Sequence, residues 1–522
     1  MAETPLAQIR NCDVLVIGGG INGAGTARDL AGRGFSTLLC EKDDLAGHTS
    51  SASTKLIHGG LRYLEQYEFR LVRKALIERE VLMRCAPHLI RPLAFILPHD
   101  DSRRPAWLVR AGLLVYDCLA KRRLLARSHA VDLRTHAAGA ALQPRLIRGF
   151  RYFDGWVDDA RLVVLNALDA AQRGAAVLSR TACVELRRSE QGWVATLADR
   201  DGRLMTVRAR AVVDACGPWA GRLSRAASSQ SAPHSAPTQI PLRLVKGSHI
   251  VVKKLFAHDD AYLFQHADGR VIFAIPYERD FTLIGTTDID FDGDLDRVSI
   301  GPGEIAYLCG AVSHYFRQPV VPQDVVWSYA GVRPLQADDA GASAASGMTR
   351  DYRLVLDSAG APLLTVLGGK LTTFRRLAEE AADLIGTALG RPPSHWTANS
   401  CLPGGDLHGA LPSNRSVLEF DDWVAQQSLH HPWLPSSLLQ RYARSYGTRM
   451  TVLLAGATAL EGLGAEILPE LYAAEIAYLV QHEWACCAED ILWRRTKRGL
   501  HLPADAAERL DAWLFLTYPK LN

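Results

Sequence analysis

The chain has 522 residues, of which 48% are hydrophobic and 22% are charged. This composition is typical of a globular protein with two or three domains, and it excludes disorder over most of the length. The 59 Lys and Arg residues exceed the 56 Asp and Glu residues by only three, so nucleic acid is not expected as a partner.

The cysteines and the first residues indicate the cellular context. The ten cysteines include no CxxC pair, which favours reduced thiols in a cytoplasmic protein and predicts no metal site. The N-terminus lacks the basic region and the long apolar segment of a secretory signal, and no apolar stretch approaches the roughly 20 residues that span a bilayer. We therefore expect neither secretion nor a transmembrane helix.

The first elements in chain order form a β-α-β unit. Residues 12–17 are mostly aliphatic and run into three glycines, which predicts a buried parallel strand. A helix over about 22–33 and a second buried strand over 36–40 complete the unit. The opening of the chain is therefore predicted to be doubly wound α/β.

The middle of the chain alternates between helical and strand-like patterns. The expected elements are helices at 65–90, at 161–173 and up to about 388, and strands within 177–214 and at 248–252, 271–275, 281–286 and 363–367. Residues 211–215 are expected to return to the first sheet, and the short strands after 243 favour an antiparallel sheet that binds a substrate.

These patterns predict two interleaved lobes and a third domain. The nucleotide-binding lobe takes approximately residues 10–90, 150–220 and 350–390, and the substrate lobe takes approximately 91–149 and 221–349. After residue 390 the pattern is helical, so 391–522 is expected to form a C-terminal α-helical domain.

A glycine motif lies between the first strand and the first helix. Residues 18–23, Gly-Gly-Gly-Ile-Asn-Gly, satisfy G-x-G-x-x-G in the context of a dinucleotide site. Gly18 permits a tight turn, Gly20 lets a pyrophosphate approach the backbone, and Gly23 lets helix and strand pack closely. Glu41 ends the second strand, where it can bind ribose hydroxyls and repel the 2′-phosphate of NADP. This motif fits FAD and NAD equally.

Two further segments favour FAD. Residues 49–60 form a small polar segment, rich in backbone donors, that can run beside a flavin. Residues 368–372, Gly-Gly-Lys-Leu-Thr, open a helix whose N-terminus can stabilise negative charge on the flavin ring. No residue is clearly positioned for covalent attachment, so we expect FAD to be held noncovalently.

A series of longer motifs then occurs in a fixed order. They are Val-Ile-Gly-Gly-Gly-Ile-Asn-Gly-Ala-Gly (16–25), Lys-Leu-Ile-His-Gly-Gly-Leu-Arg-Tyr-Leu-Glu (55–65), Trp-Val-Asp-Asp-Ala-Arg-Leu (156–162), Lys-Gly-Ser-His-Ile-Val-Val (246–252), Ile-Gly-Thr-Thr-Asp (284–288), Gly-Val-Arg-Pro-Leu (331–335), Thr-Arg-Asp-Tyr (349–352), Gly-Gly-Lys-Leu-Thr-Thr (368–373), Leu-Pro-Gly-Gly (402–405) and Trp-Arg-Arg-Thr-Lys (493–497). In this combination the sequence resembles the FAD-dependent, respiratory (aerobic) glycerol-3-phosphate dehydrogenases over essentially its whole length.

The resemblance implies both a fold and an activity. The fold class is α/β, with a Rossmann-like FAD-binding domain of the glutathione-reductase/amino-acid-oxidase type, an antiparallel-sheet substrate domain and a C-terminal α-helical domain. The activity is oxidation of sn-glycerol 3-phosphate to dihydroxyacetone phosphate, with electrons passed through FAD to membrane quinone. Two alternatives stay open: a glycerol-3-phosphate oxidase that uses oxygen, and a flavin-binding module without turnover. A homodimer is also left open.

Candidate site residues follow from the motifs and the resemblance. The expected cofactor-binding residues are Gly18, Gly20, Asn22, Gly23, Glu41, Thr49, Ser50, Ser51, Lys55, Leu56, His58, Gly59, Gly60, Gly369, Lys370, Leu371 and Thr372. His48 stands where the resemblance expects a small residue, and we interpret it as a surface or loop histidine, with contact to the cofactor as the alternative.

The substrate needs two kinds of group. A phosphomonoester brings nearly two negative charges into a partly dry pocket, so it needs several cations. The expected substrate-binding residues are Arg62, Tyr63, Arg333, Arg350 and Lys370. The hydroxyl proton also needs a base, for which His58 and His249 are the candidates. Arg333 is the alternative catalytic group, as a cation that stabilises the developing alkoxide.

Residues 103–134 form a local basic patch. It contains Arg103, Arg104, Arg110, Lys121, Arg122, Arg123, Arg127 and Arg134, and within it Trp107, Leu108, Ala111, Leu114 and Val115 fall on one helical face. This pattern is typical of an interfacial helix on anionic lipid, and the alternative is a core-facing helix with solvated basic ends. The resemblance to monotopic membrane enzymes favours lipid at the inner face of the cell membrane. The basic segment 493–497 is the next candidate anchor.

Overall fold

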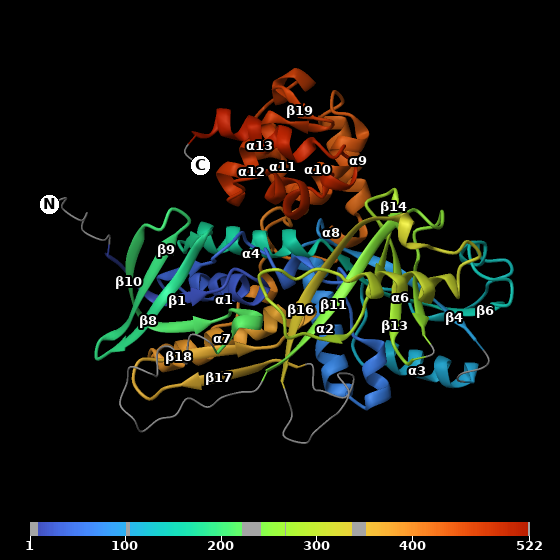
Figure 1. Ribbon diagram of the computed structural model, residues 1–522, viewed down its shortest axis with the longest axis horizontal. Coiled ribbons are helices and arrows are strands. Elements are labelled where there is room, and N and C mark those ends of the chain that lie inside the picture. Colours follow the sequence, from blue (N-terminus) through green and yellow to red (C-terminus); the bar gives the residue numbers. More distant parts are fainter. Residues whose placement is uncertain (1–8, 101–104, 222–241, 267, 337–350, 520–522) are drawn as a thin grey trace.

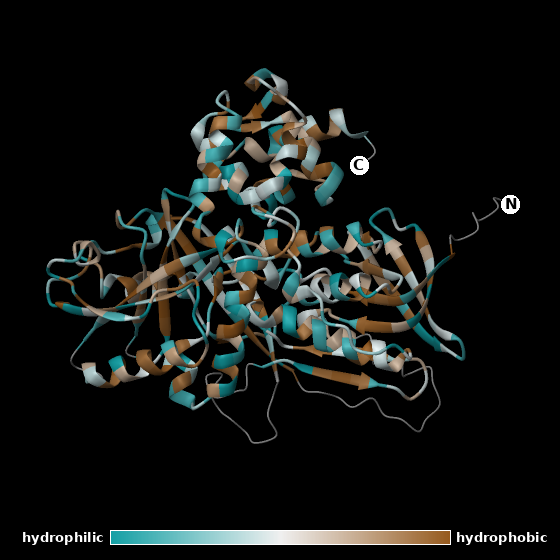
Figure 2. Ribbon diagram, turned by 180° about the vertical axis from the view of Figure 1, so that it is seen from behind, coloured by the Kyte–Doolittle hydropathy of each residue, from teal (hydrophilic) through white to brown (hydrophobic). Residues whose placement is uncertain are grey.

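The computed structural model describes residues 9–100, 105–221, 242–266, 268–336 and 351–519. These residues form two large β-sheets and a helical region that is stacked on one side of them (Figure 1). Hydrophobic residues concentrate in the strands of both sheets, and polar residues in the connecting loops (Figure 2).

The first sheet carries the glycine motif. Its strand order is β17-β18-β10-β1-β2-β7, and β9 and β8 extend it from β10. These strands are β1 (Ile9–Ile17), β2 (Thr37–Cys40), β7 (Ala176–Leu178), β8 (Thr181–Ser189), β9 (Gly192–Asp199), β10 (Leu204–Asp214), β17 (Arg353–Asp357) and β18 (Leu363–Leu367). β1 runs parallel to both β2 and β10, so the carboxyl ends of the three strands lie at one edge. The predicted β-α-β unit and the strand that returns to it are confirmed.

The second half of β1, residues 14–17, is buried on both faces, as a central parallel strand should be. Val14 and Val16 point into the core beneath the helices, whereas Leu15 and Ile17 point into the core of the β8–β10 side. The helices on the first face are α1 (Ile21–Gly32), α4 (Asp159–Gln172) and α7 (Phe374–Ala388), and α1 packs against both of the others. The alternation fixes the register of β1, because a slip of one residue would exchange its two faces.

The second sheet is antiparallel except where β4 runs parallel to β12. Its strand order is β15-β11-β14-β13-β12-β4-β6-β3, with β16 paired to β11 and β5 paired to β6. The strands are β3 (Leu56–Ile57), β4 (Ile90–His99), β5 (His129–Asp132), β6 (Arg148–Val157), β11 (Leu242–Lys253), β12 (Ala261–Gln265), β13 (Val271–Tyr277), β14 (Phe281–Gly285), β15 (Ile289–Asp290) and β16 (Val325–Gln336).

Two strands differ from the expected division into lobes. The sequence pattern assigned residues 56–57 and 150–157 to the nucleotide-binding lobe, but β3 and β6 belong to the second sheet. β6 pairs with β4 along its whole length, and the rings of Tyr152 and Phe95 stack at 5.2 Å across this pair. A strand pattern in the sequence does not show which other strand it will pair with. Here the packing of aromatic side chains across β4 and β6 favours the observed pairing.

Three helices border the second sheet: α2 (Phe69–Cys85), α3 (Ala106–Cys118) and α6 (Pro302–Ser313). α2 is shorter than the helix predicted over 65–90. The preceding residues Leu61–Gln66 form a 3-10 turn, and Tyr67 ends this turn in the left-handed conformation with φ +60°. Arg62 and Tyr63 therefore lie on a tight turn and not on the helix.

The C-terminal region is helical and has its own hydrophobic core, to which Trp423, Tyr442 and Ile476 contribute. Its helices are α8 (Arg415–Leu418), α9 (Phe420–His430), α10 (Ser436–Tyr446), α11 (Met450–Leu454), α12 (Ala473–Glu483) and α13 (Ala506–Thr517), with a π-helical turn at Asp490–Arg495. It also holds a short hairpin that the sequence pattern did not predict, β19 (Glu466–Leu468) and β20 (Leu471–Tyr472). No helix in the described part of the chain is long and apolar enough to cross a bilayer.

Candidate functional site

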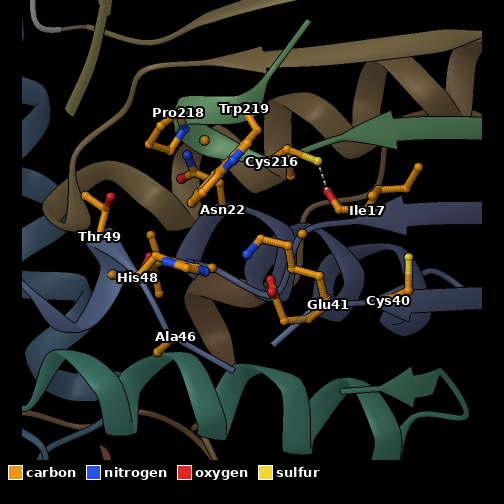
Figure 3. A pocket seen from close by; sticks show the side chains of 18 of the residues that line it. Ile17, Asn22, Cys40, Glu41, Ala46, His48, Thr49, Cys216, Pro218 and Trp219 are labelled. Carbon is orange, nitrogen blue, oxygen red and sulfur yellow. Dashed lines mark hydrogen bonds between the residues drawn. The ribbon is translucent and has the colours of Figure 1, made fainter. Parts of the chain in front are cut away.

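A cavity of about 280 Å³ opens where β1, β2 and β10 end. In open parallel sheets, ligands bind outside the carboxyl ends of the strands. The segments that follow the three strands all line this cavity, and Glu41, His48 and Trp219 surround the same space (Figure 3). The predicted residues Gly18, Gly20, Asn22, Glu41, Thr49 and Ser50 are part of its lining.

The glycines of the motif are required by close backbone contacts. A Cβ on Gly23 would lie 1.8 Å from the carbonyl oxygen of Gly18, and a Cβ on Gly18 would lie 2.5 Å from the carbonyl oxygen of Ala215. Gly18 also has φ +110°, which L side chains rarely adopt. The turn therefore packs against both the helix and β10, and it presents bare backbone to the cavity.

Glu41 and Asn22 supply polar groups to the cavity. Glu41 Oε2 accepts a hydrogen bond from Gly19 N at 2.6 Å, and Glu41 Oε1 accepts one from Asp43 N at 2.9 Å. Burial raises the pKa of the Glu41 carboxyl above its ordinary value. Asn22 Nδ2 donates to Gly368 O at 3.1 Å, whereas Asn22 Oδ1 is buried and has no hydrogen-bond partner among the described residues.

This donor set fits a dinucleotide such as FAD. The N-terminus of α1 faces the cavity, and Ile21 N donates to Ser50 Oγ at 3.0 Å, where a phosphate oxygen is favoured by the helix dipole. The carboxylate of Glu41 is available for ribose hydroxyls, and the orphaned Asn22 Oδ1 can accept from a ligand.

Several residues of the cavity were not predicted. Gly217, Pro218 and Trp219 follow β10 and form the wall opposite Glu41, and their position after a third parallel strand is the signal that could have identified them. His48 is not a detached loop histidine, because its Nε2 lies 2.7 Å from Asp43 Oδ2 and its ring centroid lies 4.7 Å from that of Trp219.

The polar segment 49–60 takes several different roles. Thr49 Oγ1 donates to Val332 O at 2.8 Å, which ties this segment to the second sheet. Lys55 is buried and pairs with Asp159 at 2.8 Å, while the side chain of Leu56 packs in the core of the second sheet. Ser51 and Lys55 line an adjoining cavity of about 520 Å³, which residues of the C-terminal region also line. It shares Gly47, His48, Thr49, Pro218 and Trp219 with the first cavity.

The glycines of this segment are also conformational requirements. Gly60 has φ +77°, and its Cβ would lie 2.3 Å from the ring of Tyr63. A Cβ on Gly59 would lie 2.6 Å from Tyr116 Oη, which accepts from Gly59 N at 2.9 Å. Thr372, at the second predicted helix start, bonds to the backbone of His58, with His58 N donating to Thr372 Oγ1 at 3.1 Å.

The predicted substrate cations lie in two groups. Lys370 Nζ lies 3.8 Å from the ring centroid of Tyr63, and Arg62 is half-buried in the same turn. Arg333 Nη2 donates to Asp288 Oδ1 at 2.5 Å and to Thr287 O at 3.1 Å. Arg350, as well as Arg103 and Arg104 of the basic patch, lies outside the described residues.

The two candidate bases have different surroundings. His249 lies in β11, is 2% exposed, and stacks on Tyr329 with ring centroids 4.8 Å apart. Its Nε2 lies 2.9 Å from Thr54 Oγ1, and its Nδ1 is buried with no hydrogen-bond partner among the described residues. Burial lowers the pKa of His249 well below its ordinary value, and the charges of Lys55 and Arg333 lower it further. The ring of His58 packs edge-on against Phe273 at 6.5 Å.

The fold and the cavity together define a dinucleotide-dependent oxidoreductase. Residues 13–375 match the FAD dependent oxidoreductase family, and residues 395–519 match the C-terminal domain of alpha-glycerophosphate oxidase. The chain belongs to the FAD-dependent oxidoreductase family, in the group that the glycerol-3-phosphate dehydrogenases represent. Its cofactor is FAD, and the predicted fold class is confirmed.

Three relatives illustrate the similarity. A glycerol-3-phosphate dehydrogenase of Pseudomonas aeruginosa is 47% identical over 519 residues, which cover 99% of this chain and 97% of that protein. A D-erythritol 1-phosphate dehydrogenase of Brucella abortus is also 47% identical, with 95% and 96% covered. The structure of a Bacillus halodurans glycerol-3-phosphate dehydrogenase with FAD is 27% identical, has a TM-score of 0.72, and matches over 98% of this chain and 89% of that one.

Proposed function

We propose that this enzyme oxidises sn-glycerol 3-phosphate to dihydroxyacetone phosphate and passes the electrons to membrane quinone. The observation that carries the proposal is the buried His249, whose Nδ1 has no partner among the described residues, close enough to Arg333 for that charge to lower its pKa. The names of the relatives from Pseudomonas and Bacillus support this substrate.

His249 is suited to take the proton of the substrate hydroxyl. Its lowered pKa keeps the imidazole neutral at pH 7, so Nδ1 can accept a hydrogen bond from the substrate hydroxyl, while Thr54 orients the ring through Nε2. The same shift makes His249 a weaker base than an ordinary histidine, so proton transfer has to accompany the loss of the hydride. FAD, when bound, supplies a hydride acceptor for C2 of the substrate. Arg333 is placed to stabilise the developing alkoxide, and His58 remains the alternative base.

We assign the phosphate group to Arg62, Tyr63, Lys370 and Arg333. Arg350, which lies outside the described residues, stays a prediction. Lys370 over the ring of Tyr63 forms a half-buried cationic group that an anion can approach. FAD is assigned to the cavity at the strand ends and to the segments 49–60 and 368–372, which include the remaining predicted cofactor residues.

Anaerobic titration tests this function. Glycerol 3-phosphate should bleach the absorbance of the bound flavin in the purified enzyme without any added acceptor. Glycerol, which lacks the phosphate, should bleach it far more slowly, because the cations would be left unpaired. An unchanged spectrum with glycerol 3-phosphate would overturn the proposal, and an unchanged spectrum with other polyol phosphates as well would favour a flavin module without turnover.

A second substrate has a specific observation behind it. The relative named D-erythritol 1-phosphate dehydrogenase is as similar to this chain as the glycerol-3-phosphate dehydrogenase from Pseudomonas. Both substrates present a secondary alcohol and a phosphomonoester, so the same cations and base serve either. The ratio of kcat/KM for the two phosphates decides between them, and a ratio in favour of D-erythritol 1-phosphate would replace glycerol 3-phosphate as the substrate.

The acceptor is tested separately. Quinone is our proposal, and oxygen is the alternative that the match to the alpha-glycerophosphate oxidase C-terminal domain supports. Turnover with a quinone and a low peroxide yield would agree with the proposal. Stoichiometric peroxide formation that quinone does not suppress would indicate an oxidase.

The proposed membrane surface is α3, at the inner face of the cell membrane. Trp107 is 71% exposed, and Leu108, Leu114 and Val115 are exposed beside it, which supports a lipid-facing helix over a core-facing one. α3 and the C-terminal region lie on opposite sides of the molecule (Figure 1). The alternative anchor at 493–497 is wrong, because Arg495 and Lys497 are buried in contacts with the first lobe.

A further inference from the structure

The π-helical turn Asp490–Arg495 of the C-terminal region packs against the segment that follows β2. Arg495 is fully buried, and its two terminal nitrogens each donate to one oxygen of Asp44 at 2.8 Å. Arg494 Nε also donates to Asp44 Oδ2 at 2.6 Å. A carboxylate that is 2% exposed is thus held by two guanidinium groups from another domain.

Asp44 does not itself line the FAD cavity, but it lies in the middle of a segment several of whose other residues do. Its neighbours in sequence, Glu41, Ala46 and His48, all line that cavity. The segment is folded back tightly, because Gly47 N donates to Asp44 O at 2.9 Å and Ala46 N donates to Gly19 O at 3.1 Å. Fixing Asp44 therefore fixes the backbone between the ribose-binding acid and the loop that leads to the flavin.

The C-terminal region is itself anchored near this point. Glu483, at the end of α12, accepts from Arg161 Nη2 of α4 at 2.9 Å, and both side chains are fully buried. The backbone oxygen of Glu483 also accepts from Arg495 Nη2 at 2.7 Å. We call Arg494 and Arg495, with Asp44 between them, the arginine clamp. Through Glu483 the C-terminal side of this clamp is attached to α4, in the helix layer of the first sheet.

We propose that Arg494 and Arg495 are positioning residues for FAD, which act through Asp44 to hold the adenosine half of the cavity in its binding geometry. Neither arginine lines the cavity at the strand ends, and Arg495 lines neither cavity, whereas Arg494 also borders the adjoining cavity of about 520 Å³. In this proposal the C-terminal region supports the cofactor site, although Arg494 and Asp44 are more than 440 residues apart in the sequence.

The experiment measures FAD affinity and uses no turnover. Apoprotein of the full chain is titrated with FAD, and the dissociation constant is read from flavin fluorescence for the unmutated protein and for Arg495→Gln, Arg494→Gln and Asp44→Asn. Coupling networks of this kind change affinity by roughly 3- to 30-fold. We expect an increase of that size in each variant, and a smaller one in Arg495→Lys, which keeps the charge but loses the fork.

The matched control is Arg441→Gln. Arg441 makes a bidentate pair with the fully buried Glu475, at 2.7 Å for one bond, inside the same C-terminal region. Its side chain is 13% exposed, close to the 11% of Arg494, and it lines neither cavity. The Arg441→Gln substitution should lower the melting temperature but leave the FAD dissociation constant unchanged. The KM for substrate at saturating FAD should be unchanged in the clamp variants.

Two results would overturn the proposal. One is a folded Arg495→Gln protein with unmutated FAD affinity, and the other is an equal loss of affinity in Arg441→Gln, which would show a general effect of stability. If Arg495→Gln does not fold, Arg494→Gln decides, because its side chain is 11% exposed and its loss is better tolerated. In Asp44→Asn/Arg494→Gln, affinity losses that simply add would also contradict action through Asp44.

Discussion

The two halves of the active site are built in different ways. The dinucleotide half consists largely of backbone groups. They are glycines at which an added Cβ would clash, a helix N-terminus and one acidic residue at a strand end. The substrate half that we propose consists of charged and aromatic side chains from β11, β16 and two distant turns. A backbone site is tied to a local motif, whereas a side-chain site depends on how sheets and turns meet.

The largest expected effect would come from breaking the backbone half with one methyl group. Gly23→Ala places a Cβ where the carbonyl oxygen of Gly18 stands, at 1.8 Å, so the turn must open and FAD should be lost. Gly303→Ala in α6 is the control, since no atom lies within 4 Å of its added Cβ. The flavin-to-protein ratio of the purified proteins is the measurement. A yellow, stoichiometric Gly23→Ala protein would contradict the account of this turn.

The side-chain half should be most sensitive at His249. Replacement by Gln removes the proton acceptor and should lower kcat by about 10²- to 10⁴-fold. His129→Gln, an exposed position on β5, should have no such effect.

The pH dependence of the unmutated enzyme also tests whether His249 is the proton acceptor. Since the pKa of His249 is lowered, the imidazole stays neutral as the pH falls from 7 to 6, where an ordinary imidazole becomes protonated. We expect kcat at saturating substrate to show no loss with an apparent pKa near 6.5 over this interval; kcat is used because the phosphate of the free substrate titrates at about pH 6 and would affect kcat/KM. A loss centred there would assign the base to a different histidine.

Removal of the phosphate cations should have a somewhat smaller effect. Lys370→Met should lower kcat/KM for glycerol 3-phosphate by roughly 30- to 4000-fold, equivalent to about 2–5 kcal/mol, and Arg333→Lys should lie at the low end because it keeps its charge. FAD affinity should change much less than kcat/KM. Lys253→Met, at an exposed position of β11, is the control. Equal kcat/KM for glycerol and glycerol 3-phosphate in the unmutated enzyme would argue against a phosphate site.

The smallest effects concern α3, which lies outside both halves. Changing the exposed Lys121, Arg123 and Arg127 to Gln should weaken sedimentation with anionic vesicles by about 1 kcal/mol per residue and leave activity with a dye acceptor intact. Arg122 is excluded, because it pairs with the buried Asp117 at 2.7 Å. Changing Arg187, Arg203 and Arg208, exposed on the β8–β10 side, serves as the control. Equal loss in both triple variants would indicate a nonspecific charge effect.

The same contrast explains what could be predicted from the sequence. The glycine turn, Glu41 and the strand at Leu363–Leu367 were predicted at their observed positions, because residues close together in sequence determine them. The pairing of β6 with β4 was not predicted, because it depends on aromatic packing between distant segments.

Buried charges posed the same difficulty. Arg495 and Lys497 were read as surface cations, since only the folded chain shows the carboxylates of Asp44 and Asp158 that neutralise them. His48 was likewise interpreted from its position in a loop of the sequence. Its contact with Trp219, more than 170 residues later, is visible only in the folded chain.

The strand order of the first sheet also has a consequence for biosynthesis. β10 pairs with β1 on one side, and on the other side β9 covers Leu204–Ala209 while β18 pairs only with Val212–Asp214. β18 begins at Leu363, about 350 residues after β1 ends at Ile17. At ribosomal rates of about 5–20 residues per second, this last part of β10 stays unpaired on that side for roughly ten to thirty seconds after its own synthesis, and β1 waits for a similar time before β10 is made. An unpaired, apolar strand edge promotes aggregation. We therefore expect the nascent chain to depend on chaperones until β18 has left the ribosome.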